Sequence, residues 1–308
     1  MNYATKLCIV SMMSVFSVSS IGLVQAADTP IVSTGGAAYN IGLQGSTFSN
    51  SDNVSLGGQT GATNSNPYLY TRDPNARGNN VAIGRLALNG SNGGGNVALG
   101  GKTFVEGKGD YNFMGTFAAG YKATLSDTVA IGYFSGANAT GNKNVWIGRS
   151  QASGSKGNNT VLIGSNSTVD GNFNYGIGHN AELKGESNAV VGAYNHVTAN
   201  NTYVLGDHVD TTLNNAVVLG SHSTAESSDV VSTPSYTYAG GTVNFAGTAP
   251  VSTVSVGATN QERTITHVAA GRVSADSTDA INGSQLYGAN QQIDNLYNKI
   301  SNIGKEAN

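Results

Sequence analysis

The sequence has little charge, few aromatic rings and almost no cysteine. Only 11% of its 308 residues are charged and 7% are aromatic, and the formal net charge is -3. With a pI near 5.9 and no basic block, nothing in the chain is suited to neutralise a phosphate backbone, so we exclude nucleic acid as a partner. The one cysteine, Cys8, lies near the N-terminus, which leaves the rest of the chain without a disulfide or a cysteine-bound metal.

Long apolar runs are confined to the N-terminus. Lys6 precedes an apolar run from Leu7 to Val24, and Val24-Gln25-Ala26 ends it in the pattern of a cleaved export signal. We therefore predict a signal peptide over residues 1–26, with an uncleaved membrane helix as the alternative. No later stretch reaches the ~18 apolar residues that a spanning helix needs. An exported chain without disulfides must be stabilised by burial or by oligomerisation.

Motifs for catalysis and cofactor binding are also missing from the sequence. It has no nucleophile motif, phosphate-binding loop or zinc-ligand spacing. Calcium-binding β-rolls need a carboxylate at each turn, whereas the turns here carry Asn, Thr, Ser and Gly. We predict a protein that is not an enzyme and that takes no cofactor, no metal and no small-molecule substrate.

Glycine, by contrast, is abundant: 42 of the 308 residues are glycine, which is about twice the ordinary usage of about 7%. Many glycines close a short apolar motif, such as NVWIG at residues 144–148. The intervals between closing glycines are 16, 15, 17, 16, 16, 14, 14, 14 and 14 residues, and the glycines are Gly84, Gly100, Gly115, Gly132, Gly148, Gly164, Gly178, Gly192, Gly206 and Gly220. Short Val- and Ile-rich segments at this period predict one coil of a β-solenoid per repeat.

Asn or Thr stands four residues before most of the closing glycines. Because Asn tolerates the left-handed backbone of tight corners, we assign these positions to the corners of the coil. The set is Asn80, Asn96, Thr128, Asn144, Thr160, Asn174, Asn188 and Thr202.

The three residues before each closing glycine are apolar on both faces of the predicted strand. We expect the first and third, such as Val161 and Ile163, to face the inside of the coil. The middle residues are Ala82, Ala98, Ala130, Trp146, Leu162, Val190, Val204 and Val218. Since one coil of 14 residues is too thin to bury both faces, we predict that these middle residues form the core of a homotrimer, with Trp146 at the inter-chain face. A surface Trp146 available to a ligand is the alternative.

The five histidines are His179, His196, His208, His222 and His267. His208 and His222 each lie two residues after a closing glycine, so a solenoid stacks them ~4.8 Å apart. At that distance they could share a soft metal ion or repel each other when protonated. The more ordinary interpretation, which the sequence favours, is two exposed residues in a turn row with Asn166, Asn180 and Tyr194.

The end of the chain has a heptad pattern. Apolar residues occupy its two seam positions, and Ile at both favours three or more strands in a coiled coil. The seam residues are Leu286, Ala289, Ile293, Leu296, Ile300 and Ile303. A single amphipathic helix packed on the preceding domain is the alternative.

Two segments interrupt the repeat. The stretch SYTYAGGTVNFAG alternates apolar and polar residues around Gly240-Gly241, which predicts a hairpin inserted over residues 226–250. The stretch NPYLYTRDPNAR, residues 66–77, contains two prolines and predicts a loop.

The repeat resembles the head of YadA-like trimeric autotransporter adhesins. RTITHVAAGRVSADSTDAINGSQL, residues 263–286, is similar to the neck of that family, and STVSVG, residues 252–257, looks like its last head coil. The resemblance implies an all-β, left-handed parallel β-roll head that is trimeric and is followed by a neck and a short α-helical coiled coil. The implied organisation is a signal peptide (1–26), degenerate coils and a loop (27–79), the head (80–225), the insertion (226–250), the last coil (251–257), the neck (258–285), the start of the coiled coil (286–303) and a tail (304–308).

The resemblance also implies a function. It predicts a bacterial cell-surface adhesin that forms a homotrimer and attaches, without catalysis, to host matrix proteins, host cells or other bacteria. The alternative is a trimeric stalk, spacer or phage-type fibre with no ligand of its own, although an export signal is evidence against the phage fibre. The sequence assigns no ligand-binding residues.

Localisation follows from two features. The signal peptide predicts export, and the family resemblance implies the cell surface or outer membrane. The four transmembrane strands of the family's C-terminal anchor have no counterpart in the five residues after Ile303. Three expectations remain open: a released or periplasmic protein, a chain truncated relative to the family, and a chain that depends on the barrel of another chain. We favour truncation, with the outer surface as the location that the resemblance implies.

Overall fold

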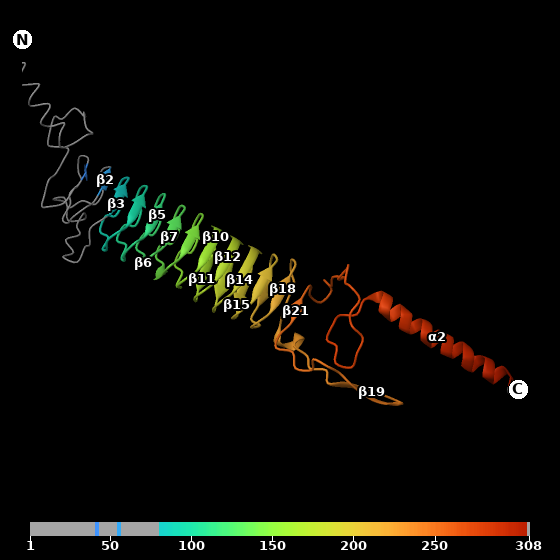
Figure 1. Ribbon diagram of the computed structural model, residues 1–308. Helices are drawn as coiled ribbons and strands as arrows, with labels where there is room; N and C mark the ends of the chain where they lie inside the picture. The colour runs from blue at the N-terminus through green and yellow to red at the C-terminus, as the bar shows by residue number, and fades with distance from the viewer. Residues whose placement is uncertain (1–40, 43–53, 57–79, 307–308) are drawn as a thin grey trace, which may run out of the picture.

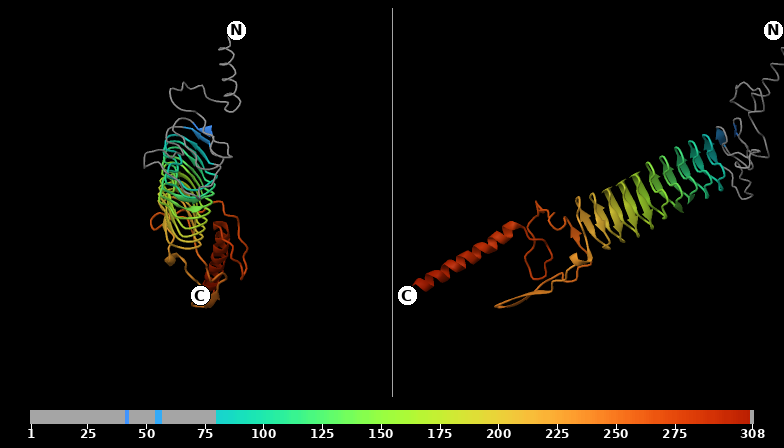
Figure 2. Two further views of the ribbon diagram at one scale, coloured as in Figure 1. Left: turned by 90° about the vertical axis from the view of Figure 1, so that its left-hand side faces the viewer. Right: turned by 180° about the vertical axis from the view of Figure 1, so that it is seen from behind.

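The chain forms a parallel β-solenoid followed by a hairpin, a neck and one long helix (Figure 1). The computed structural model describes residues 41–42, 54–56 and 80–306. The predicted signal peptide and the predicted loop within residues 66–77 lie outside this range. The coils stack along one axis, and the helix continues beyond the last coil (Figure 2). The parallel β-solenoid and the C-terminal helix confirm the predicted fold class.

One side of the solenoid is a 13-stranded parallel sheet. Each of its strands pairs with the strand one coil earlier and one coil later, so that Ala130 pairs with Trp146 and Trp146 with Leu162. In spatial order the strands are β1 (Ile41–Gly42), β2 (Val54–Leu56), β3 (Val81–Ile83), β4 (Val97–Leu99), β5 (Phe113–Gly115), β7 (Val129–Ile131), β9 (Val145–Ile147), β10 (Val161–Ser165), β12 (Tyr175–His179), β14 (Ala189–Ala193), β16 (Tyr203–Leu205), β18 (Val217–Leu219) and β21 (Val254–Ser255).

The opposite side carries shorter strands in the same parallel arrangement. A two-stranded sheet pairs β6 (Thr124–Ser126) with β8 (Thr140–Asn142), and a four-stranded sheet runs β11 (Thr168–Asp170), β13 (Glu182–Lys184), β15 (His196–Thr198), β17 (Asp210–Thr211). Isolated bridges join the two sheets through Lys156, which pairs with Thr140 and with Asp170. The chain therefore crosses to the opposite face and returns in every coil that carries both strands.

The closing position of each coil brings two backbones into contact. At Gly148 the backbone has φ +130°, and a Cβ there would lie 1.5 Å from the carbonyl oxygen of Gly164. Only glycine fits such an approach. The register nevertheless corrects one predicted member of this row: Gly115 pairs with Leu99 and Ile131, so Thr116, at φ +77°, occupies the closing position instead.

The Asn and Thr row also has a different role from the predicted one. The left-handed corner lies one residue earlier, for example at Lys143 with φ +58°. Asn144 instead bridges neighbouring coils: its Oδ1 accepts from Thr160 N at 2.9 Å, and its Nδ2 donates to Gly157 O at 2.9 Å. Because Asn144 and Thr160 are buried, the bond between them satisfies a backbone N–H that is removed from water.

The interior of the coil is filled by the middle residues of the strands, not by their first and third residues. The predicted trimer core, Ala82, Ala98, Ala130, Trp146, Leu162, Val190, Val204 and Val218, is 0–3% exposed within one chain. These side chains point into their own coil, so they cannot form the contact between chains, and that prediction was wrong. Alternation along the strand then turns the first and third residues outward.

Trp146 fits this interior because its neighbours provide space and a hydrogen-bond partner. Its Nε1 donates to Thr160 Oγ1 at 2.9 Å. Gly136 lies across the coil, where a Cβ would come within 2.9 Å of Trp146 Cε3. The predicted position at the inter-chain face is therefore corrected to the centre of the coil.

The C-terminal part begins with an insertion between β18 and β21. It contains the 3₁₀ turn η1 (Ser227–Asp229) and an antiparallel hairpin of β19 (Ser235–Tyr238) and β20 (Gly241–Asn244). The segment predicted as the neck, and called the neck below, follows β21 and leads into α2 (Gly283–Glu306). Arg263 closes the end of the solenoid: its guanidinium donates to Ser221 O and Val256 O, both at 2.7 Å.

Candidate interaction surface

The outward face of the 13-stranded sheet is a continuous apolar stripe. In the described chain its third-position side chains remain more than a third exposed in most coils, with Ile163 at 38% and Leu205 at 59%. The exposed members are Ile83, Phe113, Ile147, Ile163, Tyr175, Ile177, Val191, Tyr203, Leu205 and Leu219. Soluble monomers rarely leave so long an apolar surface uncovered, which marks the stripe as an interaction surface.

Helix α2 exposes a second apolar stripe. The large seam residues Leu286, Ile293, Leu296, Ile300 and Ile303 are 58–66% exposed, and Ala289 is exposed as well. No part of the described chain packs on this seam. Residues at this spacing pack as knobs into holes of neighbouring helices, so the helix presents the surface that a coiled coil needs.

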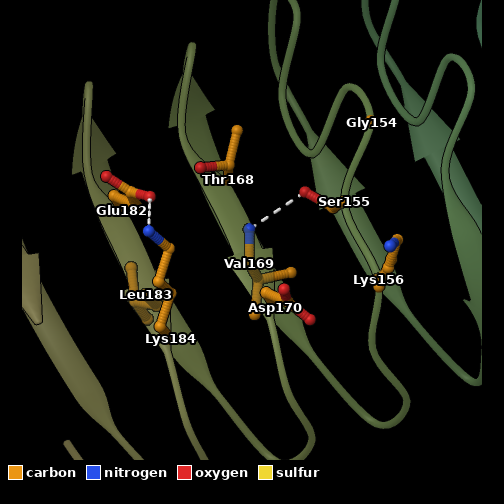
Figure 3. Close-up of a pocket in the computed structure, with 9 residues that line it drawn as sticks. All are labelled: Gly154, Ser155, Lys156, Thr168, Val169, Asp170, Glu182, Leu183 and Lys184. Carbon is orange, nitrogen blue, oxygen red and sulfur yellow. Dashed lines mark hydrogen bonds and ion pairs between the residues drawn. The ribbon is translucent and has the colours of Figure 1, made fainter. Parts of the chain in front are cut away.

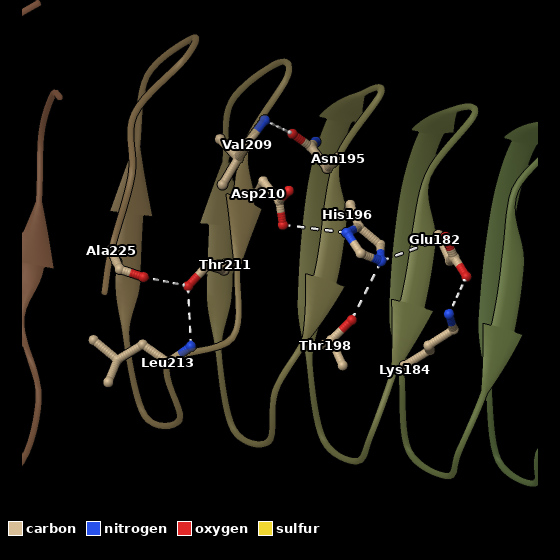
Figure 4. Close-up of polar contacts among 10 residues, drawn as sticks. All are labelled: Glu182, Lys184, Asn195, His196, Thr198, Val209, Asp210, Thr211, Leu213 and Ala225. Carbon is tan, nitrogen blue, oxygen red and sulfur yellow. Dashed lines mark hydrogen bonds and ion pairs between the residues drawn. The ribbon is translucent and has the colours of Figure 1, made fainter. Parts of the chain in front are cut away.

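The side opposite the apolar stripe is polar and carries ion pairs (Figure 4). His196 lies between two carboxylates, with Nδ1 3.1 Å from Asp210 and Nε2 3.5 Å from Glu182. Glu182 also pairs with Lys184 at 2.6 Å. That hydrogen bond lowers the pKa of the Glu182 carboxyl and raises the pKa of the Lys184 ammonium. These charges satisfy one another along and between the strands.

A shallow hollow of about 300 Å³ lies beside these ion pairs (Figure 3). Its lining includes two cations, Lys156 and Lys184, and two carboxylates, Asp170 and Glu182. The polar groups are spread along neighbouring strands, and none forms a nucleophile–base pair. In the part of the chain that the structure describes, no group of three or more His, Cys, Asp or Glu residues is arranged to hold a metal ion.

The turn row after the closing position carries a ladder of rings. His208 and His222 stack with their centroids 4.9 Å apart and their planes 7° from parallel, as their offset from the closing glycines predicts. Tyr194 stacks on His208 at 4.8 Å, and His179 contacts Tyr194 edge-on at 5.3 Å. Within the row, Nδ1 of His208 lies 2.7 Å from Asp207.

This ladder is built on backbone that favours other residues. Asn166, Asn180, Tyr194, His208 and His222 all have φ between 52° and 56°. Asn and His are enriched in this left-handed conformation, whereas for Tyr it is uncommon. Ring stacking therefore accompanies an unfavourable backbone conformation at Tyr194. The other two histidines are separate from the ladder: His196 is in the polar sheet, and His267 is exposed in the neck.

A second aromatic cluster was not anticipated from the sequence. Phe117 and Tyr133 stack at 5.6 Å, and Phe134 contacts Tyr133 edge-on at 4.7 Å. Phe117 and Tyr133 lie one residue after the closing position of their coils. The count of closing glycines places the closing position at Gly115 instead of Thr116. This offset of one residue hides the alignment of Phe117 with Tyr133 in the sequence.

The sequence of the C-terminal part matches a known family. The family described as the coiled stalk of trimeric autotransporter adhesins matches residues 264–308. The autotransporter adhesin BtaE of Brucella suis biovar 1 (strain 1330) is 57% identical over 72 residues, which are 23% of this chain and 10% of that protein. In these matched segments the chain is similar to the YadA-like trimeric autotransporter adhesins.

One solved structure is also similar to part of the chain. The C-terminal YadA-like domain of BPSL2063 from Burkholderia pseudomallei shares 43% identity, over 37% of this chain and 53% of that domain, with a TM-score of 0.35. The matched segment spans only a tenth of BtaE. Across the described residues, α2 and every other helix are too short or too polar to cross a bilayer.

Proposed function

We propose that this chain is the head, neck and first part of the stalk of a homotrimeric bacterial adhesin. Three chains would pack in parallel with the apolar stripes of their 13-stranded sheets toward one axis and with their α2 seams in one coiled coil. The observation that carries the proposal is the pair of apolar stripes, one on the 13-stranded sheet and one on α2, that one chain leaves uncovered. Closed cyclic symmetry is the usual way to cover such surfaces.

The trimer would leave the polar side and the ring ladder free to contact a ligand. Both repeat along the solenoid at one strand spacing, so they offer rows of similar groups to an extended partner. We propose host matrix proteins, host cells or other bacteria as that partner, and the cell surface or outer membrane as the location. The open, shallow hollow and the absence of a nucleophile–base pair among its lining residues support a non-enzymatic role.

Two measurements on the purified chain test this proposal. Sedimentation equilibrium should give three times the mass of one chain, which is 31.4 kDa before the predicted signal peptide is removed. Surface plasmon resonance over immobilised collagen, fibronectin and laminin should then show saturable binding to at least one of them. A trimer that binds no matrix protein and no cell surface would favour a spacer without a ligand of its own, and a monomer would refute the trimer.

The ladder provides a matched pair of variants for the binding measurement. Tyr194→Asn places the residue of the neighbouring coils, such as Asn180, on the same backbone, and it removes the central ring of the ladder. Thr198→Ser on the polar face is the control. If the ladder contacts the ligand, the first variant weakens binding while the control does not.

A further inference from the structure

The hairpin β19–β20 has one apolar face that its own chain leaves uncovered. The pairs Tyr236↔Val243 and Tyr238↔Gly241 share one side of the hairpin, and Phe245 continues that side by alternation. The four large side chains are 43–64% exposed: Tyr236, Tyr238, Val243 and Phe245. An isolated two-stranded hairpin is at best marginally stable in water, so this face needs a partner.

The other face of the hairpin is polar. Thr237 and Thr242 face each other across the strands, with their Oγ1 atoms 3.0 Å apart. Ser235 and Asn244 form the next pair on that side. The hairpin is therefore two-sided in the manner of a strand pair that packs against a protein surface on one side and meets water on the other.

The position of the hairpin limits what can cover it. It leaves the last coil and projects beyond the solenoid in the same general direction as α2 (Figure 1). At its base, Gly247 lies against the neck, where a Cβ would come 3.1 Å from Thr278 Cγ2. In an in-register assembly, the solenoid of a second chain ends at the same height. Beyond that height the second chain offers its neck, its α2 and its own hairpin, and the exposed aromatic side chains of α2 favour the neck and α2 as the partner.

Helix α2 has aromatic side chains that a coiled coil would not use. Tyr287 and Tyr297 are 64% and 71% exposed, and neither occupies a seam position. In a trimer with a buried seam they would stay on the outside of the stalk. They match the Tyr-rich face of the hairpin in chemistry, and Tyr pairs are favoured where one end of the ring stays hydrated.

We propose that the apolar face of the hairpin packs on the neck and α2 of a second copy of this chain, and thereby clasps the junction between head and stalk. The inference rests on the proposed trimer. The hairpin would add a contact between chains at the point where the sheet interface ends and the helical one begins. Its three copies would surround the stalk.

Photo-cross-linking tests the contact directly in the full chain. A benzophenone amino acid replaces Tyr236 on the apolar face, and in a matched protein it replaces Thr237 on the polar face. Trimers are assembled from equal amounts of ¹⁴N and ¹⁵N chains, so that mixed-isotope peptide pairs identify links between chains. We expect position 236 to give links to residues 258–306 of another chain and position 237 to give few.

The outcomes separate this inference from the proposed trimer. A protein that sediments as a monomer refutes the trimer and the clasp together. A trimer in which position 236 links only within its own chain refutes the clasp alone. The double variant Tyr236→Ser/Val243→Thr gives a second readout: we expect α2 to lose hydrogen-exchange protection, with Thr237→Ser/Thr242→Ser as the control. Unchanged protection combined with loss of matrix binding would make the face a ligand site and would also refute the clasp.

Discussion

Adjacent substitutions at Leu162 and Ile163 should have opposite consequences, because the two side chains point to opposite sides of one strand. Leu162 is fully buried inside the coil, whereas Ile163 is 38% exposed on the apolar stripe. Leu162→Asp loses the burial of a leucine, about 1.5–3 kcal/mol, and adds an unpaired buried carboxylate at a cost of several kcal/mol. The sum is comparable with the whole stability of a typical domain, roughly 5–15 kcal/mol. We expect this variant to unfold.

Ile163→Asp should instead separate the chains while each coil stays folded. If the trimer buries the 38% of Ile163 that one chain leaves exposed, the contact contributes about 0.6–1.1 kcal/mol per chain. Over three chains this is about 2–3 kcal/mol, and three carboxylates would also have to be desolvated. Far-UV circular dichroism and the emission of Trp146 should remain those of the parent, while sedimentation should show a monomer.

The comparison of the two variants decides which face lies between chains. Folded monomers from Leu162→Asp together with intact trimers from Ile163→Asp would reverse the assignment of the faces. Leu162→Ala is the milder control for packing, with an expected loss of about 2–5 kcal/mol and no new charge.

Three further predictions concern single residues. Asn144→Ala should lower the free energy of unfolding by about 1–3 kcal/mol for each buried group left unpaired, whereas Asn144→Thr, which keeps an acceptor as at Thr160, should cost less; urea titration measures both. Trp146 is fully buried within one chain, so acrylamide should quench it weakly in the trimer and equally weakly in the Ile163→Asp protein. Because pairing with Lys184 lowers the pKa of Glu182 below its ordinary 4.5, this pair stabilises the fold above that pH and loses its contribution as pH falls through the folded pKa. Glu182→Gln should remove this acid-dependent loss, which we expect to be under about 1 kcal/mol at so exposed a site, in thermal melts between pH 3 and 7.

The period of the repeat was predictable because a close backbone contact allows little choice of residue. Gly148 approaches the next coil so closely that no side chain fits, and the same contact recurs in almost every coil. Counting two residues from each closing glycine also predicts that His208 stacks on His222, as observed. The error at Gly115 has a simple cause: a glycine that stands one residue early resembles a closing glycine, and only strand pairing shows that Thr116 holds that place.

The role of the Asn row was less predictable because one residue type serves two purposes. Asn adopts left-handed backbone, and its amide also pairs with backbone groups of a neighbouring segment. Asn159 does the first, with φ +54°, while Asn144 does the second. The presence of Thr at equivalent positions indicates that this row accepts hydrogen bonds between coils and does not form the left-handed corners. Thr supports left-handed backbone poorly, but its hydroxyl can accept from the next coil, as Thr128 Oγ1 does from Asn144 N.

The inside and outside of the strands could not be separated by alternation, since Val161, Leu162 and Ile163 are all apolar. The variation in side-chain size between coils distinguishes the two faces of the strand better than the alternation of apolar and polar residues does. The middle position varies from Ala98 to Trp146, whereas the first and third positions keep more uniform volumes in most coils. A large side chain fits inside one coil when the residue across that coil is small, as Gly136 is opposite Trp146. A surface that must fit other copies over many coils benefits from uniformity. Large variation in size therefore indicates the interior of a coil, and recurring Val and Ile indicate the outward surface, which we propose is shared between chains.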